Sequence, residues 1–194
     1  MENKKIAPFS LDLDLATGMC LSGKSQPTHR FVSNMVNQFS DRAAAEEIVR
    51  NGDKPIYDFY ELGQIPETDG DFKFGTSIVF SGKVGDEYFM TKGHFHTLLD
   101  TGEVYYCLAG EGAMLMETPE GEVDIQWMKP GVAVYVPPRW AHRSINTGKD
   151  TLVTFFAFRA DAGHDYGTIE QKGFRKLVVE RDGKPAVIDN PLWK

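Results

Sequence analysis

The sequence has few cysteines, an excess of acidic over basic residues, and no long apolar run. Cys20 and Cys107 show neither CxxC nor framework spacing, which excludes a disulfide-stabilised fold and predicts two reduced thiols. Lysine and arginine number 21 against 28 aspartate and glutamate, so the formal net charge is −7. This charge argues against sequence-independent nucleic-acid binding, which needs a basic face. No apolar run could cross a bilayer, and the N-terminus lacks the apolar core of a signal peptide. We therefore expect a cytoplasmic protein with no nucleic-acid or membrane partner.

One helix is predicted near the start of the chain. The segment DRAAAEEIVR can be capped by Ser40 or Asp41 and ended by Asn51-Gly52. The helix would belong to an N-terminal extension over residues 1–55.

The rest of the chain has the pattern of a β protein. From about Phe72 to Asp189, short segments rich in Val, Ile, Phe, Tyr and Thr are separated by Gly, Pro and Asp. Many short strands at this spacing favour an antiparallel sandwich or barrel over a βαβ fold. At 194 residues the chain suits one domain. We expect a single domain over 1–194, with the barrel over 56–194.

Histidine is scarce, yet two of the five histidines stand in one tripeptide, HFH. Side chains alternate along a strand, so His94 and His96 share a face. In the next strand, GEVYYCLAG, Glu103 shares its face with Tyr105 and Cys107, and can meet the histidines if it points inward. Two imidazoles and a carboxylate without thiolates suit Fe, Mn, Ni, Co or Zn. A third imidazole, His142, follows the strand that ends at Pro137-Pro138, at the mouth of the barrel.

These residues carry a resemblance. HFH with Glu103 and Gly110, followed by Gly131, Pro137, His142 and Asn146, resembles the two metal-binding motifs of the cupin superfamily. The chain departs from those motifs in having Tyr88 and Arg139 where glycine is common, and six residues between His96 and Glu103 instead of three or four. The strings TKGHFH, EVYY, YVPPRWAHR and DAGHDYGTIEQKGF resemble one branch, the cupin-type (archaeal-type) glucose-6-phosphate isomerases. The similarity runs from about Tyr57 to Pro191.

The resemblance implies an all-β cupin fold, a double-stranded β-helix or jelly-roll barrel with a short N-terminal helical extension. It implies interconversion of glucose 6-phosphate and fructose 6-phosphate, as in glycolysis and gluconeogenesis. One divalent ion per subunit, iron first and otherwise Ni, Mn, Co or Zn, would be held by His94, His96, Glu103 and His142. The expected partners are the sugar phosphate and a second copy, since the alternating segment FSLDLDL could add a strand to a partner's sheet.

The chemistry needs a Lewis acid, a base and a proton relay for an enediolate path between C1 and C2. Glu103 is the candidate base, although metal binding lowers a carboxylate's basicity. If Glu103 stays a firm ligand, His164 as base or a metal-directed hydride shift is the better account. His164 lies in a loop, with a catalytic role and a buried structural role both open.

Further site residues follow from the resemblance alone. The implied substrate contacts are Tyr57, Thr76 or Ser77, Thr91, the backbone of Gly93, Tyr105 and Tyr166. Phe158 stands where tyrosine is usual, and Gly102 stands where alanine is usual before the glutamate. Arg139 and Arg143 flank His142 and would either hold phosphate or face solvent. His29 is expected at the surface.

Two rival functions would use the same set of three histidines and one glutamate as metal ligands. A non-haem iron dioxygenase would need an apolar or thiol-bearing pocket, whereas Thr91, Tyr105 and Tyr166 promise a polar one. A non-catalytic sugar-phosphate sensor would keep the ion for structure only. Mannose 6-phosphate stays open as a second substrate.

Overall fold

The computed structural model describes residues 6–22, 25–62 and 64–193. Two α-helices and two 3-10 helices accompany the strands in this part of the chain. In chain order the elements are β1 (Thr28–Phe31), η1 (Val32–Asn34), η2 (Val36–Gln38), α1 (Arg42–Arg50), β2 (Pro55–Glu61), β3 (Phe72–Val79), β4 (Lys83–Val84), β5 (Glu87–Tyr88), β6 (Glu103–Ala109), β7 (Gly112–Glu117), β8 (Val123–Met128), β9 (Ala133–Val136), β10 (Ala141–Asn146), β11 (Leu152–Arg159), α2 (Gly167–Lys172), β12 (Lys176–Arg181) and β13 (Lys184–Asp189).

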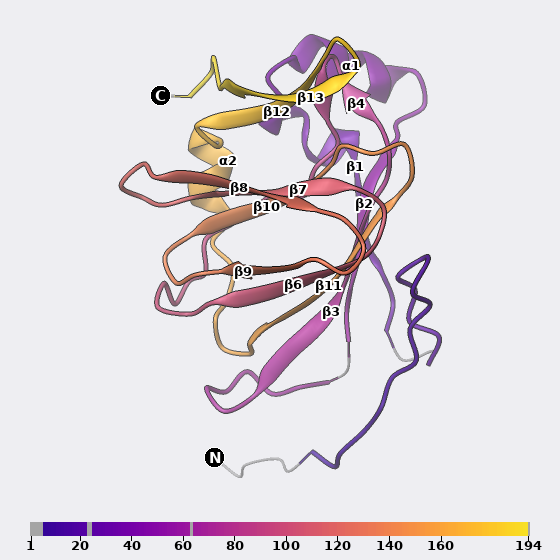
Figure 1. Cartoon of the computed structure of the whole chain (residues 1–194), viewed down its shortest axis with the longest axis vertical. Coiled ribbons are helices and arrows are strands. Elements are labelled where there is room, and N and C mark those ends of the chain that lie inside the picture. Colours follow the sequence, from indigo (N-terminus) through magenta and orange to yellow (C-terminus); the bar gives the residue numbers. More distant parts are fainter. Residues whose placement is uncertain (1–5, 23–24, 63, 194) are drawn as a thin grey trace.

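Antiparallel sheets enclose the core. A six-stranded sheet has the order β1-β2-β3-β11-β6-β9, and a three-stranded sheet has the order β10-β7-β8. Figure 1 shows the three-stranded sheet facing strands β9, β6, β11 and β3 across the barrel, with α2 beside its open end. A third sheet, β13-β12-β5-β4, completes the set. The prediction of an all-β cupin barrel is confirmed.

Strand alternation directs side chains into the barrel as predicted. On β6, Glu103, Tyr105 and Cys107 are buried, while Val104 and Tyr106 are exposed. A period of two therefore decides which residues of each strand can reach an internal site.

The predicted helix is α1, and its cap is Asp41 rather than Ser40. The Asp41 side chain accepts a hydrogen bond from the backbone N of Ala44 at 2.9 Å. Ser40 instead donates from its backbone N and its hydroxyl to the buried Glu87 carboxylate. The helix ends at Asn51, as expected.

Two features of the fold were not predicted. His164 lies in a loop, as expected, but no helix is predicted after it, whereas Gly167–Lys172 forms α2, which ends at Gly173 with φ +70°. Its six residues carry too little apolar periodicity to signal a helix. In addition, the N-terminal extension contributes β1, which pairs with β2, so it is more than a helical attachment.

Residues 6–22 cover part of the outer face of the six-stranded sheet. The hydroxyl of Thr76 donates to the Gly18 carbonyl at 2.5 Å, and Phe9 stacks on Phe74 at 6.2 Å. A Cβ on Gly18, whose φ is +73°, would lie 2.7 Å from Val153. Strand β3 is thereby covered on both faces. Within the described residues, no helix has the length and apolar character needed to cross a membrane.

Candidate functional site

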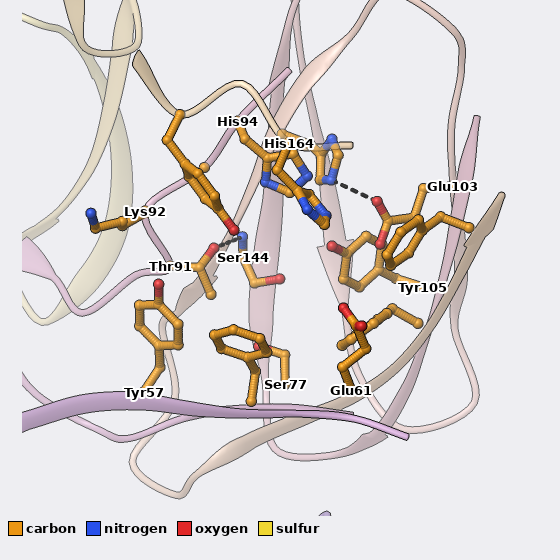
Figure 2. Close-up of a pocket in the computed structure, with 16 residues that line it drawn as sticks. Tyr57, Glu61, Ser77, Thr91, Lys92, His94, Glu103, Tyr105, Ser144 and His164 are labelled. Carbon is orange, nitrogen blue, oxygen red and sulfur yellow. Dashed lines mark hydrogen bonds and ion pairs between the residues drawn. The ribbon is translucent and has the colours of Figure 1, made fainter. Parts of the chain in front are cut away.

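A pocket opens between the two facing sheets, with an empty volume of about 580 Å³ that includes its open mouth. Figure 2 shows Tyr57 and Lys92 toward one end and Glu103 with Tyr105 toward the other. The lining residues are Tyr57, Phe59, Glu61, Ser77, Thr91, Lys92, Gly93, His94, Glu103, Tyr105, His142, Ser144, Phe156, Phe158, His164 and Tyr166.

The four residues expected to hold a metal converge at the Glu103 end. One ligand atom from each of His94, His96, Glu103 and His142 lies within 4.8 Å of all the others. His94 and His142 come together because their backbones form a two-way antiparallel bridge, at 3.3 and 3.1 Å. Residues 94–96 are extended without forming a regular strand, yet the expected alternation still holds.

Hydrogen bonds outside this group orient its imidazoles. The Thr101 hydroxyl donates its proton to the Leu98 carbonyl at 2.7 Å. The same oxygen lies 2.7 Å from His96 Nδ1, and it can only accept a hydrogen bond from this nitrogen. His96 therefore carries its proton on Nδ1 and turns Nε2 inward, 3.1 Å from Glu103 Oε2. His142 Nδ1 likewise lies 3.3 Å from the Trp140 carbonyl.

The inward nitrogens fit a metal ion. In the described part of the chain, Nε2 of His94 is buried without a hydrogen-bond partner, and Nε2 of His142 has only Glu103 Oε2 at 3.0 Å, a contact without good hydrogen-bond geometry. Such orphaned atoms are costly, and a common ion would satisfy them. Three imidazoles and one carboxylate form a donor set for a first-row divalent ion.

The electrostatics of the site keep its groups in defined protonation states. Burial alone would raise the pKa of Glu103, but its neighbours, His142 first, outweigh burial and hold the pKa below its usual range. Burial lowers the pKa of His94, with help from His142. Burial, followed by the Glu103 charge, raises the pKa of the Tyr105 phenol. At neutral pH the site thus contains a carboxylate beside a protonated phenol.

His164 lies in the loop before α2 and faces the metal group. Its ring centroid is 4.4 Å from that of His94 and 5.8 Å from the stacked Tyr166 ring. Burial lowers the pKa of His164, which favours the neutral imidazole. Phe158 meets the His164 ring edge-on at 5.1 Å, in the place where a tyrosine was expected.

Most of the expected substrate contacts line the pocket, but Thr76 does not. Tyr57, Ser77, Thr91, Gly93, Tyr105 and Tyr166 all line it. Thr76 points to the opposite face of β3, where it bonds to Gly18. Of the pair Thr76 and Ser77, only Ser77 is placed to contact a ligand.

Neither flanking arginine lines the pocket. Arg139 is exposed and pairs with Glu120 at 2.9 Å. Arg143 is buried beneath the pocket, not solvated; burial lowers its pKa to about 10 while Glu87 and Glu117 oppose the shift, so the cation persists at neutral pH. His29 is exposed, as expected, and lies 2.7 Å from Asp58.

Several pocket residues were missed by the sequence reasoning: Phe59, Glu61, Lys92, Ser144 and Phe156. Strand alternation would have found most of them. Once Tyr57 is placed in the site, a period of two on β2 brings in Phe59 and Glu61. The same rule joins Ser144 to His142. Lys92 stands in an irregular segment, where no periodicity applies.

Gly102, which stands where alanine is usual before the glutamate, lies in a tight place. A Cβ at this position would lie 3.0 Å from the Tyr135 hydroxyl and 3.1 Å from the Val136 carbonyl. An alanine methyl would therefore require the Tyr135 side chain and the Val136 carbonyl to give by a few tenths of an ångström.

The family model and the related sequences agree on one family. A family model described as glucose-6-phosphate isomerase matches residues 29–193. The chain is 48% identical to a glucose-6-phosphate isomerase of Thermococcus litoralis, covering 96% of this chain and 97% of that protein. It is 46% identical to that of Pyrococcus furiosus, with 96% and 97% covered, and 38% identical to that of Sinorhizobium medicae, with 98% and 90% covered. A deletion mutant of Bacillus subtilis oxalate decarboxylase gives a TM-score of 0.43 and 22% identity, covering 54% of this chain and 26% of that chain. The chain belongs to the glucose-6-phosphate isomerase family.

Proposed function

We propose that the protein interconverts glucose 6-phosphate and fructose 6-phosphate, as in glycolysis and gluconeogenesis. The observation that carries the proposal is a single pocket with a metal-ligand group at one end and hydroxyl, amide and cationic groups at the other. A sugar phosphate has the same two-ended chemistry, because its reacting carbonyl and its phosphate lie at opposite ends. Relatives named for this activity align along nearly the whole chain.

His94, His96, Glu103 and His142 would hold one divalent ion per subunit, with iron proposed first and Ni, Mn, Co or Zn as alternatives. When bound, such an ion supplies a Lewis acid for the sugar's carbonyl and hydroxyl oxygens. Metal analysis of the purified protein identifies the ion.

Glu103 is the proposed base for proton transfer between C1 and C2. Its lowered pKa keeps Glu103 deprotonated but also makes it a weak base, so this role requires that Glu103 loosens its contacts with the imidazoles and the ion when sugar binds. The protonated phenol of Tyr105 can donate a hydrogen bond to a sugar oxygen, and neutral His164 can relay a proton between oxygens. Solvent-hydrogen exchange into C1 or C2 during turnover tests this path, because a hydride passed between carbons does not exchange with water.

The phosphate would bind at the other end of the pocket, near Tyr57, Thr91, Gly93 and Tyr166. Lys92 supplies a nearby cation, with its Nζ 5.8 Å from the Tyr166 ring centroid and 2.6 Å from Glu170 Oε1. A local cation of this kind can attract a phosphate to a protein whose net charge is −7.

The deciding experiment is a coupled isomerase assay on metal-stripped and metal-reloaded protein, with circular dichroism in parallel. Activity should disappear on stripping and return on reloading, while the fold largely survives because the core does not depend on the ion. Oxygen consumption would favour the dioxygenase instead. Phosphosugar binding without turnover in the metal-loaded protein would favour the sensor, and mannose 6-phosphate is assayed alongside.

A homodimer in the cytoplasm completes the proposal. Val104 and Tyr106 on β6 and Tyr135 on β9 form an apolar patch on the outer face of the six-stranded sheet, and they are 44%, 43% and 61% exposed. Val104 and Tyr135 are direct cross-strand neighbours. Patches of this kind mark interaction surfaces. Light scattering at micromolar concentration should give twice the chain mass, and a monomer mass would contradict the proposal.

A further inference from the structure

Arg143 is a fully buried cation whose contacts all lie away from the metal group. It neighbours His142 on β10, but alternation sends the two side chains to opposite faces. Its Nη2 donates to the Lys92 carbonyl at 2.5 Å and to Gln38 Oε1 at 3.0 Å. The guanidinium also lies over the Phe174 ring, 4.5 Å from its centroid. These contacts fix the plane of the guanidinium.

The chain opposite Arg143 leaves the regular ladder. Thr91 N donates to Ser144 O at 2.9 Å, and the ladder resumes with His94 and His142. Two residues, Lys92 and Gly93, therefore oppose the single residue Arg143, which is the count of a β-bulge.

Glycine is required in this bulge. Gly93 has φ +74°, and a Cβ there would lie 2.6 Å from the Phe174 ring and 3.1 Å from Arg143 Cβ. The bulge turns the Lys92 carbonyl out of the ladder and toward the guanidinium.

Peptide planarity connects this contact to the pocket. In a trans peptide the C=O and the following N–H point in opposite directions, and the described residues contain no cis peptide. Since the Lys92 carbonyl points down to Arg143, the Gly93 N–H points the other way, into the pocket that Gly93 lines.

We propose that Arg143 is a positioning residue: by holding the Lys92 carbonyl from below, it aims the Gly93 N–H at the anionic group of the ligand. The inference rests on the proposed function only in taking the anionic group of the ligand to be a phosphate. Arg143 itself touches no ligand. Its place next to the metal-binding His142 is explained by its contact with the Lys92 carbonyl, and it need not bind the phosphate directly.

The first test observes the amide directly in zinc-loaded, diamagnetic protein. The sequence contains two Lys-Gly pairs, Lys92-Gly93 and Lys172-Gly173. Labelling lysine with carbonyl 13C and glycine with 15N therefore isolates two amide signals. On titration with inorganic phosphate, the Gly93 proton should move downfield as it gains a hydrogen bond, while Gly173 at the end of α2 should stay in place. A Gly93 signal that does not respond at saturating phosphate would overturn the proposal.

The second test compares Arg143→Lys with Arg139→Lys, the same change at the exposed arginine nearby. Lysine keeps the positive charge but loses the planar guanidinium, with its several fixed N–H donors and its stacking on the Phe174 ring. Arg143→Lys should weaken phosphate binding and raise KM roughly tenfold, the size of one hydrogen bond to a charged group, with kcat changed less than about threefold and metal content unchanged. Arg139→Lys should match the wild type. Wild-type phosphate affinity in folded Arg143→Lys would refute the positioning role.

These measurements separate the two proposals. If metal-loaded wild-type protein binds phosphate at Gly93 but turns over no sugar phosphate, the isomerase proposal fails, and the role of Arg143 is decided independently by the phosphate affinity of Arg143→Lys. If Arg143→Lys does not fold, the wild-type titration still tests the direction of the Gly93 N–H, and a Gly93 signal that stays in place at saturating phosphate overturns the proposal without any variant.

Discussion

Replacing Thr101 with valine tests how the metal group is oriented. The hydroxyl is committed as a donor to the Leu98 carbonyl, so it accepts from His96 Nδ1 and fixes the tautomer that leaves Nε2 free. Valine has nearly the same shape and removes this acceptor. The Thr101 carbonyl remains, 3.0 Å from Nδ1, and can hold the ring less firmly.

The size of the effect follows from what remains. Losing an outer-shell partner of a ligating histidine typically costs 10- to 100-fold in metal affinity. Because one acceptor survives, we expect the lower end, about tenfold or about 1.4 kcal/mol. Unfolding of the metal-free protein should become easier by about 1 kcal/mol for the lost hydrogen bonds. Competition with a chromophoric chelator measures the affinity, and thermal melts measure the stability.

Two variants serve as controls. Thr101→Ser keeps the hydroxyl and should bind metal as the wild type does. Thr154→Val changes another buried threonine, whose hydroxyl has no hydrogen-bond partner among the described residues, so metal affinity should not change and stability should hold or rise. If Thr101→Val binds metal within twofold of the wild type, the orientation argument is refuted.

Three more predictions concern the pocket. Glu103→Gln should lower turnover by roughly a hundred- to ten-thousand-fold while metal analysis still finds the ion; near-normal turnover would remove Glu103 as base. Burial raises the pKa of Tyr57 to about 12. The neutral phenol therefore stabilises the folded protein fully below the unfolded pKa near 10, and this contribution is lost as the pH rises toward 12. Over this window the free energy of unfolding, measured by denaturant melts, should fall by about 2–3 kcal/mol less in Tyr57→Phe than in the wild type. Ser77→Ala should raise KM, whereas Thr76→Val should leave KM unchanged and cost about 1–3 kcal/mol of stability by orphaning a carbonyl; the reverse pattern in steady-state kinetics would contradict the assignment of faces.

The parts of the site that follow from local spacing could be predicted from sequence. His94, His96 and Glu103 meet because a period of two holds wherever the backbone is extended, even in a segment without a regular ladder. The α1 helix was predictable for a similar reason, since its cap, Asp41, and its stop, Asn51, directly flank it in the sequence.

The choice between Thr76 and Ser77 depends on tertiary packing. Both residues are buried, because residues 6–22 cover the outer face of β3 while the pocket lies on the inner face. A strand covered on both faces has no polar side to reveal its orientation. Only the pairing of Phe59 with Ser77 and of Tyr60 with Thr76 identifies the inner residue.

The six-residue connection between His96 and Glu103 shows how a departure from a motif can carry chemistry. A shorter connection would leave fewer residues between His96 and Glu103 that could turn back and contact the His96 ring. Here the connection turns so that both oxygens of Thr101 reach Nδ1 of His96. Thr101, a residue of this longer connection, therefore provides the acceptors that orient one of the metal ligands. It follows that shortening this loop should weaken metal binding even though all four ligands remain.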